Sequence, residues 1–260
     1  MTPAEQWASA LGEWAIPDSI LRQAPEDPWV HPPAMFRVEA DATFDETPSH
    51  AAARAALGDG GSVLDVGVGG GRSSLPLVPP AAAMAGVDEQ QAMLDQFVEA
   101  AARLGVAATT YRGRWPEVAA SVPTADVVVC HHVAYNVADI EPFVRALTEH
   151  ARRRVVVELP GRHPTSWMNP LWERFWSLPR PSEPSADLFV ELVRALGFRP
   201  DVASAERLPR NTEAQAEPAF VAFVRRRLYL PATRDAEVAA ALAEVPPAAQ
   251  RIVTVSWPAS

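Results

Sequence analysis

The sequence predicts an α/β fold, a doubly wound sheet of seven strands that is mostly parallel and has helices on both faces. From residue 62 onward, short apolar runs alternate with segments of helical periodicity, and repeated βα units build a parallel sheet. A glycine cluster follows the first apolar run, as it does where open α/β sheets bind ligands. With 48% hydrophobic and 21% charged residues, the 260-residue chain has the composition of a globular protein with a core.

Runs that are apolar or rich in β-branched residues, bounded by turn residues, predict the strands. The expected strands are 62–66, 83–88, 107–111, 125–130, 153–158, 198–207 and 251–257. Helical spacing of apolar residues predicts the helices, with a strand at 219–224 left open as an alternative. The expected helices are 5–14, 49–57, 71–77, 89–104, 115–120, 139–150, 167–177, 185–196, 213–229 and 233–244. Ser49 is expected to cap its helix, and Gly58 to end it.

The distribution of proline suggests how the chain is organised. Residues 1–50 are rich in proline, tryptophan and alanine without sustained periodicity, so we expect them to form an N-terminal cap. Residues 51–260 are expected to form the main domain, with helical insertions at about 160–184 and 213–244. The insertion at 160–184 contains a helical face of large apolar side chains, which is either core packing or a lid over an apolar ligand.

The glycine cluster has a definite spacing, Asp65-x-Gly67-x-Gly69-x-Gly71. A dinucleotide fingerprint would need glycine at the position of Arg72, so the cluster does not fit that motif. The spacing and its carboxylate resemble motif I of the class I S-adenosylmethionine-dependent methyltransferases. The resemblance is strongest from residue 51 to about 158, and it implies a Rossmann-like seven-stranded sheet with one antiparallel strand. It also implies S-adenosylmethionine as cofactor and S-adenosylhomocysteine as product.

The resemblance also implies roles for residues at the strand ends. Asp65 suits the ammonium group of the cofactor, the three motif glycines let the backbone approach it, and Asp88 would hold the ribose hydroxyls. Glu89 would lie near the adenosine, where the family often has an apolar residue. Arg114 stands where family members commonly have an acid that accepts from the adenine amino group, so that contact is in doubt. Trp115 would lie beside the adenine, or else only pack a helix start.

The fourth expected strand runs into a polar segment that contains His131, His132 and Tyr135. By position, the resemblance places His131 at the border of the cofactor and His132 or Tyr135 towards the acceptor, as the candidate catalytic residues. A neutral imidazole can act as a base where the acceptor must lose a proton. A plain loop role for these histidines stays open. No residue spacing supports a metal site, and the G-x-S-x-G elbow of a hydrolase is absent from the sequence.

The predicted function is therefore methyl transfer from S-adenosylmethionine to a small-molecule acceptor. The alternatives are a non-catalytic S-adenosylmethionine-binding module, acting as a sensor or scaffold, and a nicotinamide-dependent reductase. A net charge of −9 favours neither nucleic acid nor a membrane surface as partner. The single cysteine excludes an internal disulfide, and the first residues do not resemble a signal peptide, so a cytoplasmic location is expected. The sequence leaves the acceptor and the oligomeric state undetermined.

Overall fold

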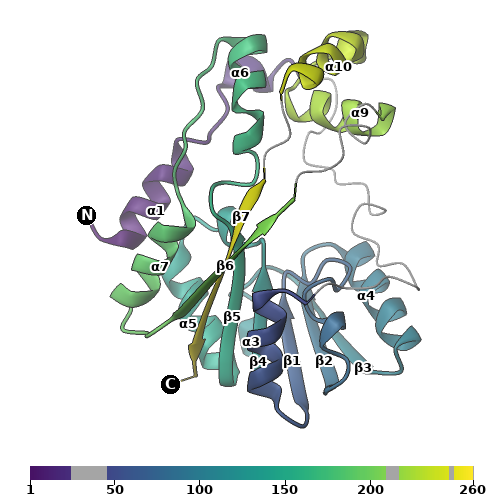
Figure 1. The fold of residues 1–260 in the computed structure, drawn as a ribbon, viewed down its shortest axis with the longest axis vertical. Helices are drawn as coiled ribbons and strands as arrows, with labels where there is room; N and C mark the ends of the chain where they lie inside the picture. The colour runs from purple at the N-terminus through teal and green to yellow at the C-terminus, as the bar shows by residue number, and fades with distance from the viewer. Residues whose placement is uncertain (25–45, 209–216, 246–248, 260) are drawn as a thin grey trace.

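The structure is a computed structural model that describes residues 1–24, 46–208, 217–245 and 249–259. At its centre is one seven-stranded sheet in the order β3-β2-β1-β4-β5-β7-β6 (Figure 1). The strands are β1 (Gly61–Val66), β2 (Ala81–Asp88), β3 (Ala107–Arg112), β4 (Ala125–His131), β5 (Ala151–Pro160), β6 (Asp201–Arg207) and β7 (Gln250–Pro258). The strand β7 runs antiparallel to both of its neighbours, β5 and β6, and the other neighbouring pairs are parallel. The predicted Rossmann-like sheet is confirmed, including its antiparallel strand.

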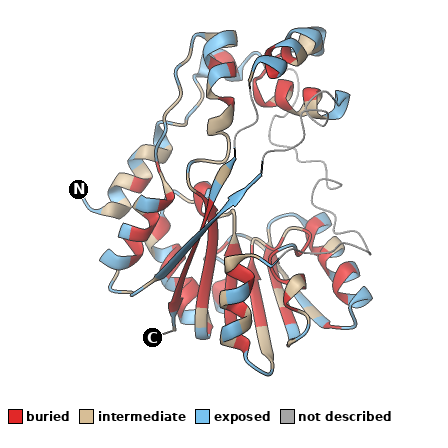
Figure 2. Ribbon diagram, viewed as in Figure 1, coloured by how far each residue is buried: buried red, intermediate tan, exposed pale blue. Residues whose placement is uncertain are grey.

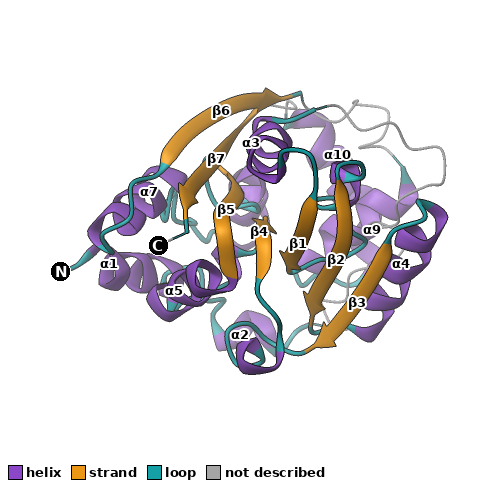
Figure 3. Cartoon of the chain, turned by 90° about the horizontal axis from the view of Figure 1, so that it is seen from below, coloured by secondary structure: helices purple, strands orange, loops and turns teal. Residues whose placement is uncertain are grey.

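The central strands are buried on both faces, as Figure 2 shows, because each is a nearly continuous apolar run. In β4, Val127 and Val129 face one core cluster while Val128 and Cys130 face the other. Helices cover both faces, which confirms the doubly wound arrangement. One face carries α3 (Pro48–Leu57) and α4 (Gln91–Arg103). The other carries α1 (Pro3–Gly12), α5 (Ile140–His150) and α7 (Ala186–Ala195), which lie together in Figure 3.

A second group of helices lies beyond the carboxyl ends of the parallel strands, at the top of Figure 1. It contains α6 (Asn169–Trp176), α9 (Pro218–Arg227) and α10 (Asp235–Glu244), and it shares an apolar cluster with the short helix α2 (Asp18–Leu21). The helix α9 replaces the alternative strand at 219–224. Two parts of the expectations, residues 25–45 of the N-terminal cap and the start of the 213–229 helix, lie outside the described residues.

Two expected helices are wrong. In place of 71–77 there is a turn and a single 3-10 turn, Leu75–Leu77, because Pro76, Pro79 and Pro80 prevent a longer helix. In place of 115–120 there is only the 3-10 turn Ala119–Ser121.

The start of α3 also differs from the prediction, although the helix itself is present. The N-cap is Thr47, whose hydroxyl accepts from the backbone N–H of His50 at 3.2 Å. Ser49 therefore lies inside the first turn, and its hydroxyl is available for another partner. Gly58 ends the helix with a φ of +60°, as expected. Among the described helices, none has the length and apolar character that crossing a bilayer requires.

Candidate functional site

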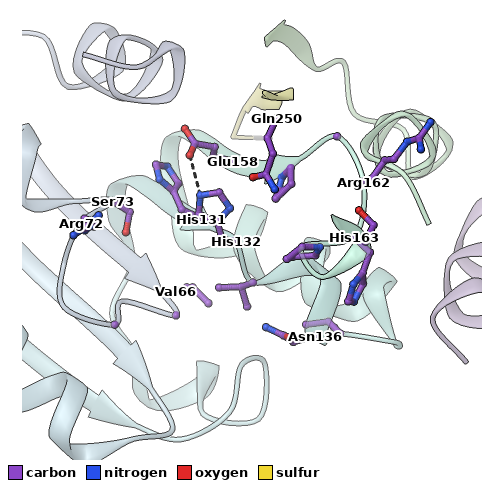
Figure 4. A pocket seen from close by; sticks show the side chains of 18 of the residues that line it. Val66, Arg72, Ser73, His131, His132, Asn136, Glu158, Arg162, His163 and Gln250 are labelled. Carbon is purple, nitrogen blue, oxygen red and sulfur yellow. Dashed lines mark ion pairs between the residues drawn. The ribbon is translucent and has the colours of Figure 1, made fainter. Parts of the chain in front are cut away.

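One cavity lies between the carboxyl edge of the sheet and the helical group α6, α9 and α10 (Figure 4). Its volume is about 2300 Å³, which exceeds the roughly 300–1,000 Å³ of a typical single-ligand pocket. The glycine loop and the ends of β2 and β3 line one half. The ends of β4 and β5, the segment 160–170 and parts of α9 line the other. The cavity can therefore hold two ligands side by side.

The glycine loop forms one wall because of its backbone conformation. Gly67 has a φ of +76° and Gly69 of +51°, values that L-residues with a side chain rarely adopt. The backbone N–H groups of Gly67 and Val68 both donate to the carbonyl of Val87, which fixes the loop against β2. A Cβ added at Gly69 would meet no atom within 4 Å, so this glycine leaves open space on the cavity side.

Asp88, at the end of β2, lies on the same wall as the glycine loop. Its Oδ2 accepts from the Gly69 N–H at 3.0 Å, and its Oδ1 accepts from the Gln90 N–H at 2.9 Å. The carboxylate thus reaches from the second strand to the loop of the first. A sugar with two adjacent hydroxyls would meet acceptor oxygens here, next to the open face of Gly69.

Asp65 lies elsewhere. Its side chain is fully buried and is not among the described residues that line the cavity. Its Oδ2 accepts from the hydroxyls of Ser73 at 2.5 Å and Ser74 at 2.6 Å, so it ties the turn after the glycine loop back to β1. Its Oδ1 has no hydrogen-bond partner in the described part of the chain. The structure thus brings Asp88 to the cavity with the glycine loop and places Asp65 beneath that loop.

The buried carboxyl of Asp65 predicts a pH dependence of stability. Burial raises the pKa of Asp65 from its usual 3.8 to about 6, although Ser73 and Ser74 act in the opposite direction. A carboxyl whose pKa is raised on folding adds stability that is fully present below its unfolded pKa and is lost as the pH rises through its folded pKa. Relative to Asp65→Asn, the wild-type free energy of unfolding should therefore fall by roughly 3 kcal/mol as the pH rises from 3.8 to about 6.

Denaturant unfolding at a series of pH values measures this difference. Asp59→Asn, in the exposed turn before β1, is the matched control and should track the wild type. If the free energies of unfolding of the wild type and Asp65→Asn depend on pH in the same way, Asp65 does not titrate as its burial demands.

Glu89 and Arg114 pair with each other. Arg114 Nε donates to Glu89 Oε1 at 2.6 Å, and both exposed side chains line the cavity beside Asp88. The two positions that depart from the family pattern therefore compensate each other, because the unexpected cation neutralises the unexpected anion. Trp115 is buried and lines the same half of the cavity. Its ring also packs edge to face against His150 of α5, outside the described lining, with ring centroids 4.7 Å apart.

His131 and His132 both line the cavity at the end of β4. Burial lowers the pKa of His131 to about 3, so its imidazole is neutral at physiological pH. His132 contacts the buried carboxylate of Glu158, with Nε2 and Oε1 3.2 Å apart; Figure 4 shows this pair. Glu158 Oε2 accepts from the Ser49 hydroxyl at 2.6 Å.

Tyr135 does not reach the cavity. Its hydroxyl donates to the Pro160 carbonyl at 2.8 Å, its ring stacks on Trp7 with centroids 5.3 Å apart, and it is absent from the described lining. Burial raises the pKa of Tyr135. Of the two candidate catalytic residues, the structure therefore places only His132 in the site, and Tyr135 serves packing.

The 160–184 insertion contributes both to the core and to the cavity wall. Met168, Leu171 and Trp172 are buried in the cluster with α9 and α10, whereas Trp167 lines the cavity. His163 also lines the cavity and stacks on Trp14, with ring centroids 3.9 Å apart. The insertion therefore supplies side chains both to the core and to the cavity wall, and a cover over a ligand stays a prediction.

Sequence reasoning gave no role in this site to Ser49, Glu158 or Arg207. For Glu158 a signal was present, because this acid ends an apolar strand at the same sheet edge as Asp88. For Ser49 the signal misled, since serine before an alanine-rich helix is a typical N-cap. Arg207 comes from the edge strand β6, whose place beside β7 and two strands from β5 follows only from the sheet order. Within the described ranges, no group of three or more His, Cys, Asp or Glu side chains could hold a metal ion.

Comparison with known proteins agrees with this architecture. Residues 63–154 match the family model of a methyltransferase domain. Solved structures share the fold, among them the YcgJ protein of Bacillus subtilis, at 18% identity and a TM-score of 0.55 over 81% of this chain and 97% of that one. A putative methyltransferase from Bacillus halodurans has 14% identity and a TM-score of 0.52, over 78% of this chain and 94% of that one. A cyclopropane-fatty-acyl-phospholipid synthase-like protein from Lactobacillus casei has 15% identity and a TM-score of 0.52, over 81% of this chain and 90% of that one. No curated protein matches the sequence.

The fold and the cavity define a Rossmann-like protein with its ligand site at the carboxyl edge of the sheet. More particularly, residues 63–154 match the model of a methyltransferase domain, which supports the resemblance to class I S-adenosylmethionine-dependent methyltransferases. S-adenosylmethionine is the cofactor of this family. The residues present fit such a group: an open glycine cradle, an acid that can accept from sugar hydroxyls, and a buried indole for a base.

Proposed function

We propose that this protein transfers the methyl group of S-adenosylmethionine to a small-molecule acceptor. The observation that carries the proposal is the continuity of one cavity from the open face of Gly69 and Asp88 to the histidines at the end of β4. Its volume suits a cofactor and an acceptor together. In this proposal Gly67, Gly69, Asp88, Glu89, Arg114, Trp115 and His131 surround the cofactor. Asp65 orders the loop from below, and Gly71, where a Cβ would meet Leu75 and Phe97, lies outside the described cavity lining.

When bound, the cofactor supplies an electrophilic methyl group, which the acceptor's electron pair takes as the bond to sulfur breaks. The protein's share is positioning and proton removal. The glycine loop and Asp88 would hold one partner, and Trp167 with α9 would cover the other. His132 would accept the proton that a hydroxyl or ammonium acceptor loses on methylation.

Calorimetry with S-adenosylmethionine, S-adenosylhomocysteine and NADH tests the cofactor assignment. We expect both S-adenosyl compounds to bind and NADH to bind more weakly. The protein is then incubated with S-adenosylmethionine and a panel of small hydroxyl, amine and carbon acceptors, with S-adenosylhomocysteine as the measured product. Binding without product from any acceptor would favour a sensor or scaffold, and tighter binding of NADH would favour a reductase.

Asp88→Ala should weaken S-adenosylmethionine binding by about 1–3 kcal/mol, because the sugar would lose charge-assisted hydrogen bonds. The exposed Asp95→Ala on α4, outside the cavity lining, is the matched control and should bind as the wild type does. The dissociation constants come from calorimetry. An unchanged constant for Asp88→Ala would remove this carboxylate from the cofactor site.

A further inference from the structure

Glu158 contacts His132 through both its backbone and its side chain. The His132 backbone N–H donates to the Glu158 carbonyl at 2.7 Å, and the His132 Nε2 lies 3.2 Å from Glu158 Oε1. His132 has a φ of +62°, in the left-handed region that a residue with a side chain occupies at a cost of about 1–2 kcal/mol. Such strain persists only where the surroundings enforce it, and here Glu158 does so.

Glu158 is itself held on several sides. Its side chain is 4% exposed, and Ser49 of α3 donates to Oε2 at 2.6 Å. Arg207 of β6 donates to Oε1 at 3.4 Å. Although burial acts to raise the pKa of Glu158, the side-chain hydrogen bonds from His132 and Ser49 hold it well below its usual value. The group beside His132 is therefore a carboxylate, which can only accept hydrogen bonds.

The two charged neighbours of Nε2 make opposite demands. Glu158 requires a proton on Nε2, because a carboxylate has none to give. Arg207, whose guanidinium nitrogen lies 3.3 Å from Nε2, can only donate and would require a lone pair there. The carboxylate is slightly closer, buried and anchored by Ser49, whereas the Arg207 side chain is half exposed and can turn away. The carboxylate therefore decides the tautomer.

We infer that Glu158 is a positioning residue that keeps the proton of His132 on Nε2 and so leaves Nδ1 as the proton-accepting atom in the cavity. This inference rests on the proposed function for its catalytic meaning. The proton that the acceptor loses on methylation passes to Nδ1, and the resulting imidazolium, stabilised by Glu158, returns it to water. Ser49 completes the arrangement by fixing the second oxygen of Glu158.

Nitrogen NMR of protein with isotope-labelled histidine tests the tautomer without any ligand. The spectrum is recorded in mildly alkaline buffer, where histidine is neutral, and the His132→Asn variant identifies the signals of His132. The groups that face His132 are His131 of β4, Glu158 of β5, Arg207 of β6 and, through Glu158, Ser49 of α3. We expect the proton on Nε2 in the wild type. A proton on Nδ1 would overturn the inference.

Substitutions at Glu158 then test whether Glu158 is the cause of the His132 tautomer. In Glu158→Leu the remaining neighbour, Arg207, donates to Nε2, so the proton should move to Nδ1. Glu158→Gln keeps an oxygen that accepts and should retain the wild-type tautomer, while Glu99→Gln, on the exposed face of α4, is the matched control. A wild-type tautomer in Glu158→Leu would overturn the inference. Should Glu158→Leu fail to fold, Ser49→Ala replaces it: freeing Oε2 should raise the share of the Nδ1 tautomer, and no change would count against the inference.

Turnover separates this inference from the proposed function. With an acceptor from the panel, Glu158→Leu should lower kcat at least tenfold, restored in part by Glu158→Gln, with the S-adenosylmethionine dissociation constant unchanged. Wild-type kcat in Glu158→Leu would refute the catalytic role of Glu158 while leaving methyl transfer intact. Failure of the wild type to bind S-adenosylmethionine would refute the proposed function instead, whatever the tautomer.

Discussion

His132→Asn should lower the turnover number of methyl transfer about 100-fold or more, because general base catalysis contributes roughly 10²–10⁴ to the rate where a proton must leave. Asparagine is chosen because it tolerates the left-handed backbone that His132 adopts. Its amide group can also donate to Glu158, so the buried carboxylate keeps a partner. The substitution therefore removes the base and leaves the fold.

The measurement pairs steady-state turnover with calorimetry of S-adenosylmethionine. We expect kcat to fall while the dissociation constant of the cofactor stays at its wild-type value. His132→Ala, which also lacks a base, should lose turnover to the same extent and lose some stability in addition, because alanine tolerates the left-handed backbone less well. Wild-type turnover in His132→Asn would show that the acceptor needs no base, as expected for a neutral amine that attacks through its lone pair.

Gly67→Ala should lower the free energy of unfolding by about 4 kcal/mol, combining backbone strain with overpacking. The φ of Gly67 is +76°, and a Cβ there would lie 2.3 Å from the Cγ2 of Val133. Val133 follows the two cavity histidines, so it cannot retreat without moving them. We therefore expect cofactor affinity to fall together with stability.

A double-mutant cycle with Val133→Ala separates the two causes. Removing Cγ2 relieves the clash but not the strained φ, so the two changes together should cost less than the sum of each alone. Gly69→Ala is the matched control, because its Cβ meets no atom within 4 Å. It should cost only about 1–2 kcal/mol of stability but weaken cofactor binding. Equal losses of stability in Gly67→Ala and Gly69→Ala would contradict the steric explanation.

The strands were predictable from sequence because burial on both faces leaves long apolar runs such as Val127-Val128-Val129, which few other structures require. The prediction of a helix at 71–77 was wrong, because Pro76 and the two prolines that follow outweigh the apolar spacing of this segment. The serines of that segment are engaged by Asp65, a tertiary contact that no local pattern reveals.

The part of the cavity that the proposal gives to the cofactor follows from motifs that are local in sequence, which is why Asp88 and Gly69 could be placed together. The part around His132 depends on contacts between distant segments. Ser49 and Glu158 are 109 residues apart in the chain, and Tyr135 looks like a site residue until its hydroxyl is found bonded to Pro160. Spacing along the chain carries no information about such pairs, so the three-dimensional structure was required.

The α9–α10 hairpin leaves the sheet after β6 and returns at β7, where Arg207 pairs with Gln250 as the last rung of an antiparallel ladder. The two residues at which the chain leaves and rejoins the sheet are therefore neighbours on adjacent strands. Under the proposed function, substitutions on the cavity face of α9 would alter the acceptor side of the cavity, whereas the glycine loop and Asp88 follow β1 and β2, on the other side of the sheet.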